Sequence, residues 1–326
     1  MKPLSARLAF PDTLEPSLNE TAALTRLVLE QEIHQGFRAR LSVSVTRSAT
    51  SDVLGLRGHH VTVHLDDEPF LPQIHGLVES VRMRISEDAD RQFLDLEVVS
   101  VAERLRHSRR QRIFHDRTVE QIVQEVFAGH PEAEPPSHAT ERGKTVREYV
   151  VQYGESDWDF VRWLLAEGGM VLLTDPGSAR TIVASDTTLE HFAPTSLPFR
   201  SHAGLEQSSE PAIRAASLST SLVPDAVVVR AFDDARPRVD LEGRANRQAP
   251  HLVGEGRGGS SGREWFEYEG RAFDSSVSAA AHASQVREEL TREEERIDCE
   301  STAALTAGSH LTVTHAPHEL GASTSS

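Results

Sequence analysis

The sequence predicts a mainly β fold with α/β additions. Short runs of alternating apolar and polar residues, typical of half-buried strands, occur at 37–45, 60–65, 74–78 and 93–99. Strands at this spacing favour a barrel or a sandwich. Two patterns of helical period, at 118–128 and 156–167, interrupt the strands and supply the α/β additions.

Length and composition describe a folded chain of about two domains, since 326 residues with 38% hydrophobic residues can bury real cores. The chain has 50 acidic against 34 basic residues, a net charge of -16. This charge argues against a general nucleic-acid footprint and against attraction to an anionic membrane surface. No apolar run approaches the ~20 residues of a membrane span, so we expect no membrane anchor.

The single cysteine, Cys299, excludes an intrachain disulfide and a cysteine-based zinc site. Outside a catalytic context such a residue is more often a small buried hydrophobe than a nucleophile. The N-terminus is broken by Pro3 and Pro11 and does not resemble a signal peptide. We therefore expect synthesis in a reducing cytoplasm, with any exit by a route other than a cleaved signal.

Four histidines among the early strands raise the question of a metal site. They are His59, His60, His64 and His75. His60 and His64 are an even number of residues apart and would share one strand face. The chain has sixteen histidines, and these four lack a second ligand motif, so a solvated strand face is the better interpretation. We predict no metal and no cofactor.

A first helix is predicted after Arg112-Ile113-Phe114. Thr118 is positioned as its cap with Gln121 three residues on, an apolar stripe follows, and Ala128-Gly129 ends it. The next segment, 130–144, contains three prolines and is predicted to be a linker or surface loop.

The central stretch, 147–173, reads as strand, cap, helix, stop and strand. Ser156 precedes Asp159 by three residues, as in an acidic capping box, and the Gly168-Gly169 pair ends the helix. Its three carboxylates, Glu155, Asp157 and Asp159, could suggest a catalytic or metal cluster. Acidic residues are favoured at helix starts in any case, so a core-forming unit is the simpler interpretation.

This stretch resembles the signature of the VgrG and phage tail-hub family (late-control protein D type), roughly R-x-x-x-x-Q-Y-x-E-S-D-x-x-F-x-x-R-L-x-x-E-x-G. Trp163 replaces the usual arginine. Segments similar to other family motifs occur in order at 74–78, 112–126 and 264–271. The signature residues, to which we assign a structural role, are Arg147, Gln152, Tyr153, Glu155, Ser156, Asp157, Phe160, Leu164, Glu167 and Gly169.

The second half contains further strand candidates at 181–185 and 226–230, and Asp186 is expected to open a turn. Residues 233–263 are predicted to be a loop. Within it, Gly254–Gly259 lacks the context of a phosphate-binding loop and is better explained as a flexible linker. A long helix is predicted over 276–297, and the closing strands, 299–302 and 307–313, are similar to the family's last strand pair.

The resemblance implies two barrel-like β domains of a tail-hub fold. We predict a first barrel over 1–110, a helix-containing α/β segment over 111–175 and a second barrel over 176–326. Family members usually continue into a small OB-fold domain and a β-helical needle, and the sequence ends before either. The needle is then absent, lost by truncation or supplied by another polypeptide.

The implied function is that of a structural hub in a contractile injection machine, either type VI secretion or a phage-like tail. The resemblance implies a homotrimer between a hexameric tube protein of the Hcp type and a spike tip or separate needle protein, with effector cargo as a further partner. It implies no enzymatic activity. Two alternatives stay open: a hub-derived effector or hydrolase, although no G-x-S-x-G or H-E-x-x-H motif occurs, and a carbohydrate- or receptor-binding β module, although aromatics make up only 6%.

Overall fold

The chain divides into two compact units in the computed structural model. The first comprises residues 1–195 and 303–310, and the second comprises 196–302 and 311–326. The predicted boundaries near 110 and 175 stay predictions. The structure describes residues 6–10, 16–46, 53–66, 71–84, 90–138, 143–178, 180–184, 195–200, 210–234, 236–246, 262–269, 275–291 and 294–315. None of the helices in these ranges is both long and apolar enough for a membrane span.

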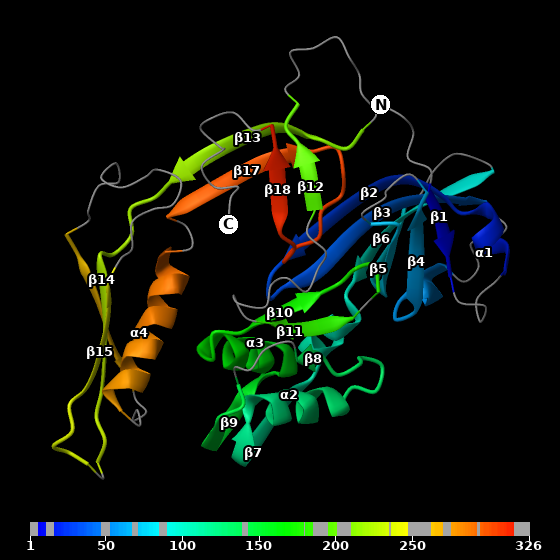
Figure 1. Cartoon of the computed structure of the whole chain (residues 1–326). Helices are drawn as coiled ribbons and strands as arrows, with labels where there is room; N and C mark the ends of the chain where they lie inside the picture. The colour runs from blue at the N-terminus through cyan, green and yellow to red at the C-terminus, as the bar shows by residue number, and fades with distance from the viewer. Residues whose placement is uncertain are drawn as a thin grey trace. The chain divides into compact units, whose positions relative to one another are not determined.

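A six-stranded antiparallel sheet forms the first half of the first unit, in the order β1-β4-β5-β6-β3-β2 (Figure 1). The two edge strands contact each other, so the sheet curls into a barrel-like form. A short helix, α1 (Pro16–Thr21), connects the first two strands of this sheet along the chain. The strands are β1 (Ala6–Ala9), β2 (Ala23–Glu32), β3 (Gly36–Thr46), β4 (His60–Leu65), β5 (Gln73–Arg84) and β6 (Arg91–Val99).

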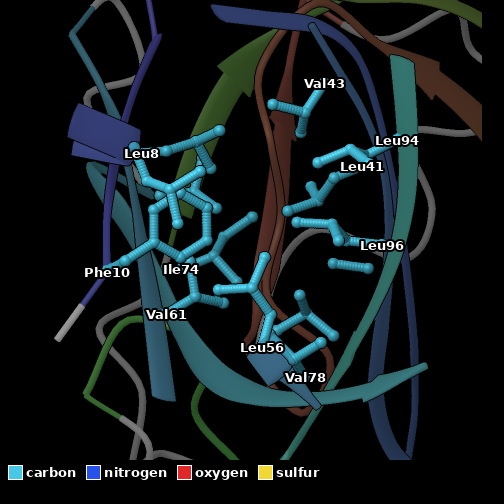
Figure 2. Close-up of a cluster of buried hydrophobic side chains, with 14 of the residues drawn as sticks. Leu8, Phe10, Leu41, Val43, Leu56, Val61, Ile74, Val78, Leu94 and Leu96 are labelled. Atoms are coloured by element: carbon cyan, nitrogen blue, oxygen red, sulfur yellow. The ribbon is translucent and has the colours of Figure 1, made fainter. Parts of the chain in front are cut away.

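The inner face of this sheet holds the first hydrophobic core, which Figure 2 shows from close by. Alternation along the strands places these side chains on one face, as the sequence predicts. Leu41, Leu94 and Leu96 are almost fully buried there. The mainly β prediction and its barrel-like first part are therefore confirmed.

The second half of the first unit contains a two-stranded sheet and two helices that pack on it. The strands are β7 (Arg109–Thr118) and β9 (Val146–Ser156), and the helices are α2 (Val119–Ala128) and α3 (Asp157–Glu167). The predicted caps are confirmed, since Thr118 and Gln121 form a capping box and Ser156 accepts from the Asp159 amide. Both helices place their apolar stripes in a second core with Trp158 and Phe160.

A small sheet completes this core, and it corrects one expectation. Its order is β10 (Val171–Thr174), β11 (Thr181–Ala184) and β8 (Ser137–His138), with β8 parallel to β11. The segment predicted to be a linker or surface loop therefore contributes a strand. His130 and Ala133 from the same segment are buried. The prolines of this segment indicate an irregular backbone, but they do not indicate whether its residues are buried.

The described residues of the second unit form three small sheets and one helix. The helix α4 (Ser276–Thr291) packs on β14 and β15 over a third core. Figure 1 shows α4 beside these two strands. The pairs are β12 (Thr195–Pro198) with β18 (Leu311–Thr314), and β13 (Ile213–Thr220) with β17 (Glu295–Ser301). The three-stranded sheet has the order β15 (Leu241–Asn246), β14 (Ala226–Ala231), β16 (Glu264–Glu269).

Two predictions for this unit are wrong. The helix predicted over 276–297 ends at Thr291, and residues 295–301 form β17. The charged run that follows Leu290 has no apolar period of its own, and residues 295–301 pair with β13 along one edge instead. The loop predicted over 233–263 contains β15. Asp186 and Gly254–Gly259 lie outside the described residues.

Helix α4 approaches its sheet so closely that Gly243 has no room for a side chain. A Cβ at this position would lie 2.1 Å from the backbone carbon of Ala279 and 2.2 Å from its carbonyl oxygen. Neither atom can move without displacing the helix. Glycine at this place in β15 therefore sets the distance between the helix and the sheet.

We expect Gly243→Ala to destabilise the second unit by roughly 1–3 kcal/mol, because added volume in a packed site forces backbone shifts. Hydrogen exchange of the α4 amides should show faster opening in the variant. The matched control is Ser217→Ala on β13, where the side chain is exposed and little change is expected. Equal protection of α4 in wild type and Gly243→Ala would contradict the close packing.

Candidate functional site

The start of α3 holds a buried charged cluster made by four segments of the chain. Asp157, the first helical residue, is fully buried. Arg112 of β7 donates to Oδ1 of Asp157. Gln152 Nε2 of β9 donates to the same oxygen at 2.8 Å, and His130 Nε2, beyond α2, lies 2.8 Å from Oδ2.

Additional hydrogen bonds fix the members of this cluster relative to one another. Arg112 Nε donates to Gln152 Oε1 at 2.8 Å, and Gln152 Nε2 also reaches the Glu155 carbonyl at 3.2 Å. The Asp157 amide donates to the Ser108 carbonyl at 2.9 Å. Both carboxylate oxygens and the fully buried Gln152 amide are thus engaged, as buried polar groups require.

The electrostatics of the cluster favour an ionised Asp157. Burial by itself would raise the pKa of this carboxyl. Hydrogen bonds from Gln152 and His130, together with the charge of Arg112, outweigh burial and bring its pKa below the ordinary value. The positive end of the α3 dipole acts in the same direction.

The other signature residues surround this cluster along β9 and α3. Arg147 Nη1 donates to Glu167 Oε2 at 2.6 Å, joining the start of β9 to the end of α3. Glu155 Oε2 accepts from Trp163 Nε1 at 2.8 Å. Trp163, which stands where the family usually has arginine, thus holds the end of β9 with a neutral donor.

The remaining signature residues divide into packed and exposed ones. Phe160 and Leu164 are fully buried, and the Phe160 ring stacks on Phe114 at 5.6 Å between centroids. Gly169 ends the helix with a φ of 64°, a left-handed conformation that favours glycine. Tyr153 differs from all of these, since it is 81% exposed. These contacts support a structural role for nine of the ten residues, and that role stays a prediction.

Sequence reasoning missed His130 as a member of the cluster and treated Arg112 only as part of a motif. The spacing of His130 from the signature gives no hint of contact, because the loop after α2 brings it back to α3. Arg112 had a weak signal, since it would be an arginine on the inward face of a strand next to Phe114. Such a charge needs a buried partner.

The structure also shows where the early histidines and Cys299 lie. His60 and His75 stack with ring centroids 5.4 Å apart, and His75 Nδ1 lies 2.8 Å from Thr62 Oγ1. Across the described ranges, no group of three or more His, Cys, Asp or Glu side chains could hold a metal ion. Cys299 is exposed on β17 rather than buried, and partial desolvation and Asp298 raise its thiol pKa, which disfavours the reactive thiolate.

Comparison with known families places this chain in one of them. The family model described as "Phage tail baseplate hub (GPD)" matches residues 30–323, nearly the whole chain. The chain belongs to this family. The match includes every residue of the buried cluster and all ten signature positions. A comparison with curated proteins finds no match.

Solved structures share the baseplate-hub fold with this chain. A 43 kDa tail protein of prophage MuSo2 from Shewanella oneidensis has a TM-score of 0.63 at 14% identity, covering 94% of this chain and 88% of that one. A tail protein from Neisseria meningitidis MC58 has a TM-score of 0.62 at 12% identity, with 95% and 86% covered.

A third similar structure comes from a secretion system. The Escherichia coli c3393 protein has a TM-score of 0.58 at 17% identity, covering 91% of this chain and 68% of that one. It is described as a component of the type VI secretion system with structural similarity to the T4 bacteriophage tail proteins gp27 and gp5. At these identities the likeness shows the fold alone.

We expect Asp157→Asn to destabilise the first unit by about 3 kcal/mol, because it leaves Arg112, whose side chain is only 19% exposed, without its counter-charge. Urea unfolding followed by tryptophan fluorescence reports the change, since Trp158 adjoins Asp157. Asp159→Asn, in the same helical turn but exposed, is the matched control and should cost no more than about 1 kcal/mol, since its side chain takes part in the helix cap through Ser156. Equal effects of the two variants would contradict the role of the cluster.

The same carboxylate predicts a pH dependence. The pKa of Asp157 in the folded state lies below its unfolded value of about 3.9, so its contribution is complete above that pH and is lost as the pH falls through the folded pKa. The unfolding free energies of wild type and Asp157→Asn should therefore differ most near neutral pH and converge below about pH 4. A difference that stays constant down to about pH 2 would contradict the assignment.

Proposed function

We propose that this baseplate-hub chain is the structural hub of a contractile injection machine, either a type VI secretion system or a phage-like tail. The family match over residues 30–323 carries the proposal. Its fold likeness to tail proteins and to a type VI secretion component supports it. In such a machine the chain would form a homotrimer that joins a hexameric tube to a spike.

The mechanical role proposed here requires a rigid body, and the first unit has the features of one. Two hydrophobic cores stabilise it, and residues 303–310 return to it from the far end of the sequence. Gln31 of β2 binds this returning segment, with its Nε2 3.1 Å from the Leu305 carbonyl and its Oε1 3.2 Å from the Ala307 amide.

We also propose that the chain has no catalytic activity of its own. Asp157 and His130 could suggest an acid–base pair, but Arg112, Gln152 and His130 occupy both carboxylate oxygens in a buried setting. A general base needs a free acceptor facing a substrate. The chain would be assembled into the apparatus, position a spike and effector cargo, and leave the cell through the machine.

The first test is the absolute molar mass of the purified chain by light scattering at several concentrations. We expect a stable mass near three times 35.9 kDa, and binding to the ends of tubes built from the hexameric tube protein of the same genome. A strict monomer at high concentration that does not bind tube ends would contradict the hub proposal. Hydrolysis of peptidoglycan or lipid, abolished by substitution of an acidic residue, would favour the hydrolase instead.

A further inference from the structure

The outward face of the curled sheet carries a hollow of about 530 Å³ over strands β2, β3, β6 and β5. Figure 2 shows Leu41, Leu94 and Leu96 directed into the core on the other face. Residues that alternate with them, such as Ser42 and Asp95, therefore face outward and line the hollow. Its volume falls within the range of about 300–1,000 Å³ found for ligand sites.

Ion pairs neutralise most charges on this outward face. They join residues that lie diagonally on neighbouring strands, and Arg38 of β3 also reaches Glu79 of β5 across β6. The pairs are Arg38 with Glu79 at 2.7 Å and Glu97 at 2.6 Å, Arg40 with Glu30 at 2.9 Å, and Arg84 with Asp95 at 3.2 Å. Ser42 and Ser80 also donate to Asp95 and Glu97, at 2.9 and 3.3 Å. The carboxylates in the hollow are thus already engaged.

Two arginines that line the hollow are exceptions. Arg26 on β2 and Arg82 on β5 belong to one row across the four strands. In the strand register, Ser42 lies opposite Arg26 and Asp95 lies opposite Arg82. In the described part of the chain, neither arginine makes a hydrogen bond or an ion pair. This chain has 50 acidic residues for 34 basic ones, yet both guanidinium groups remain without a counter-charge.

Irregularities in both strands border the same hollow. The β2–β3 register shifts between Leu24 and Arg26, and the β5–β6 register shifts between Val78 and Ser80. A β-bulge redirects the side chains beside it and occurs often next to binding sites. Arg26 and Ser80, which both line the hollow, follow these two shifts directly.

We propose that this hollow binds acidic side chains of an extended segment of another protein, with one carboxylate at Arg26 and a second at Arg82. Three strand spacings of ~4.8 Å separate the two arginines in the row, about 14 Å in all. Acidic side chains four residues apart on an extended chain are separated by about 13 Å. The spacing therefore fits one segment lying across the strands.

The charges around the hollow favour separated carboxylates over a polyanion. Asp95 and Glu97 lie in the hollow between the two arginines and would repel a continuous row of phosphates. The net charge of -16 opposes nucleic acid further. Two carboxylates that reach only Arg26 and Arg82 bring fewer negative charges near Asp95 and Glu97 than a row of phosphates would.

The test uses the purified full-length chain and a fluorescein-labelled nine-residue peptide of threonine, valine and serine, with glutamate at its third and seventh positions. Fluorescence anisotropy measures binding to wild type, to the double variant Arg26→Gln/Arg82→Gln, and to Arg7→Gln. Arg7 is an exposed arginine on β1 and is the matched control. Both hollow arginines are exposed and make no bonds, so their replacement should leave the fold intact.

We expect the double variant to bind about tenfold more weakly than wild type, as the loss of two partly exposed ion pairs implies, and Arg7→Gln to bind normally. A peptide with glutamine at both positions should bind as weakly as the double variant does. A chain carrying Arg26→Glu and Arg82→Glu should instead bind a peptide with lysine at these positions. That result excludes misfolding as the cause.

Three results would overturn the proposal. They are equal binding of the glutamate and glutamine peptides, no loss in the double variant, and no lysine-peptide binding by the glutamate variant. Displacement of the peptide by inorganic phosphate at a lower concentration than by glutarate would assign the hollow to phosphate instead. Because the measurement needs neither a trimer nor a tube, its failure and that of the hub proposal are distinguishable.

Discussion

The ion pair between Arg112 and Asp157 is the constraint on which the helical half of the first unit depends. A carboxylate with no exposure is costly unless every oxygen is bonded, and here β7, β9 and the loop after α2 supply the donors. Its position at the helix start makes one residue serve two purposes, since it opens α3 and holds three other segments to it. Removing His130 would leave Oδ2 of Asp157 without a hydrogen bond, and removing Arg112 would leave Gln152 Oε1 without its donor.

Several signature residues around α3 take part in this constraint or lie beside it. Gln152 is selected by geometry, because its amide must donate to Asp157 and accept from Arg112 at once. Phe160 and Leu164 fill the core below. Arg147 and Glu167 join the start of β9 to the end of α3. Tyr153 alone has no such explanation, since it points to solvent from the face of β9 opposite Gln152.

The alternating pattern of the strands gives the curled sheet an apolar inner face and a polar outer face. Its inner residues are apolar and nearly without exposure, and their burial stabilises the sheet. Its outer residues are charged, and their pairing across strands keeps that surface soluble at little energetic cost. Arg26 and Arg82 depart from this pairing, whereas the rest of the face follows it. This contrast is the reason for proposing a binding site at these two arginines.

The sequence by itself determined the elements whose signal is local. Alternation predicted β3, β4 and β6, and the capping patterns at Thr118 and Ser156 predicted α2 and α3, because these signals depend on neighbours within four residues. It also contained the family motifs. Only the tertiary structure decided that His130 joins Asp157, that residues 295–301 pair with β13 and that Gly243 contacts α4. Each of these depends on segments far apart in the chain, where the free energy comes from long-range packing and pairing that no local pattern encodes.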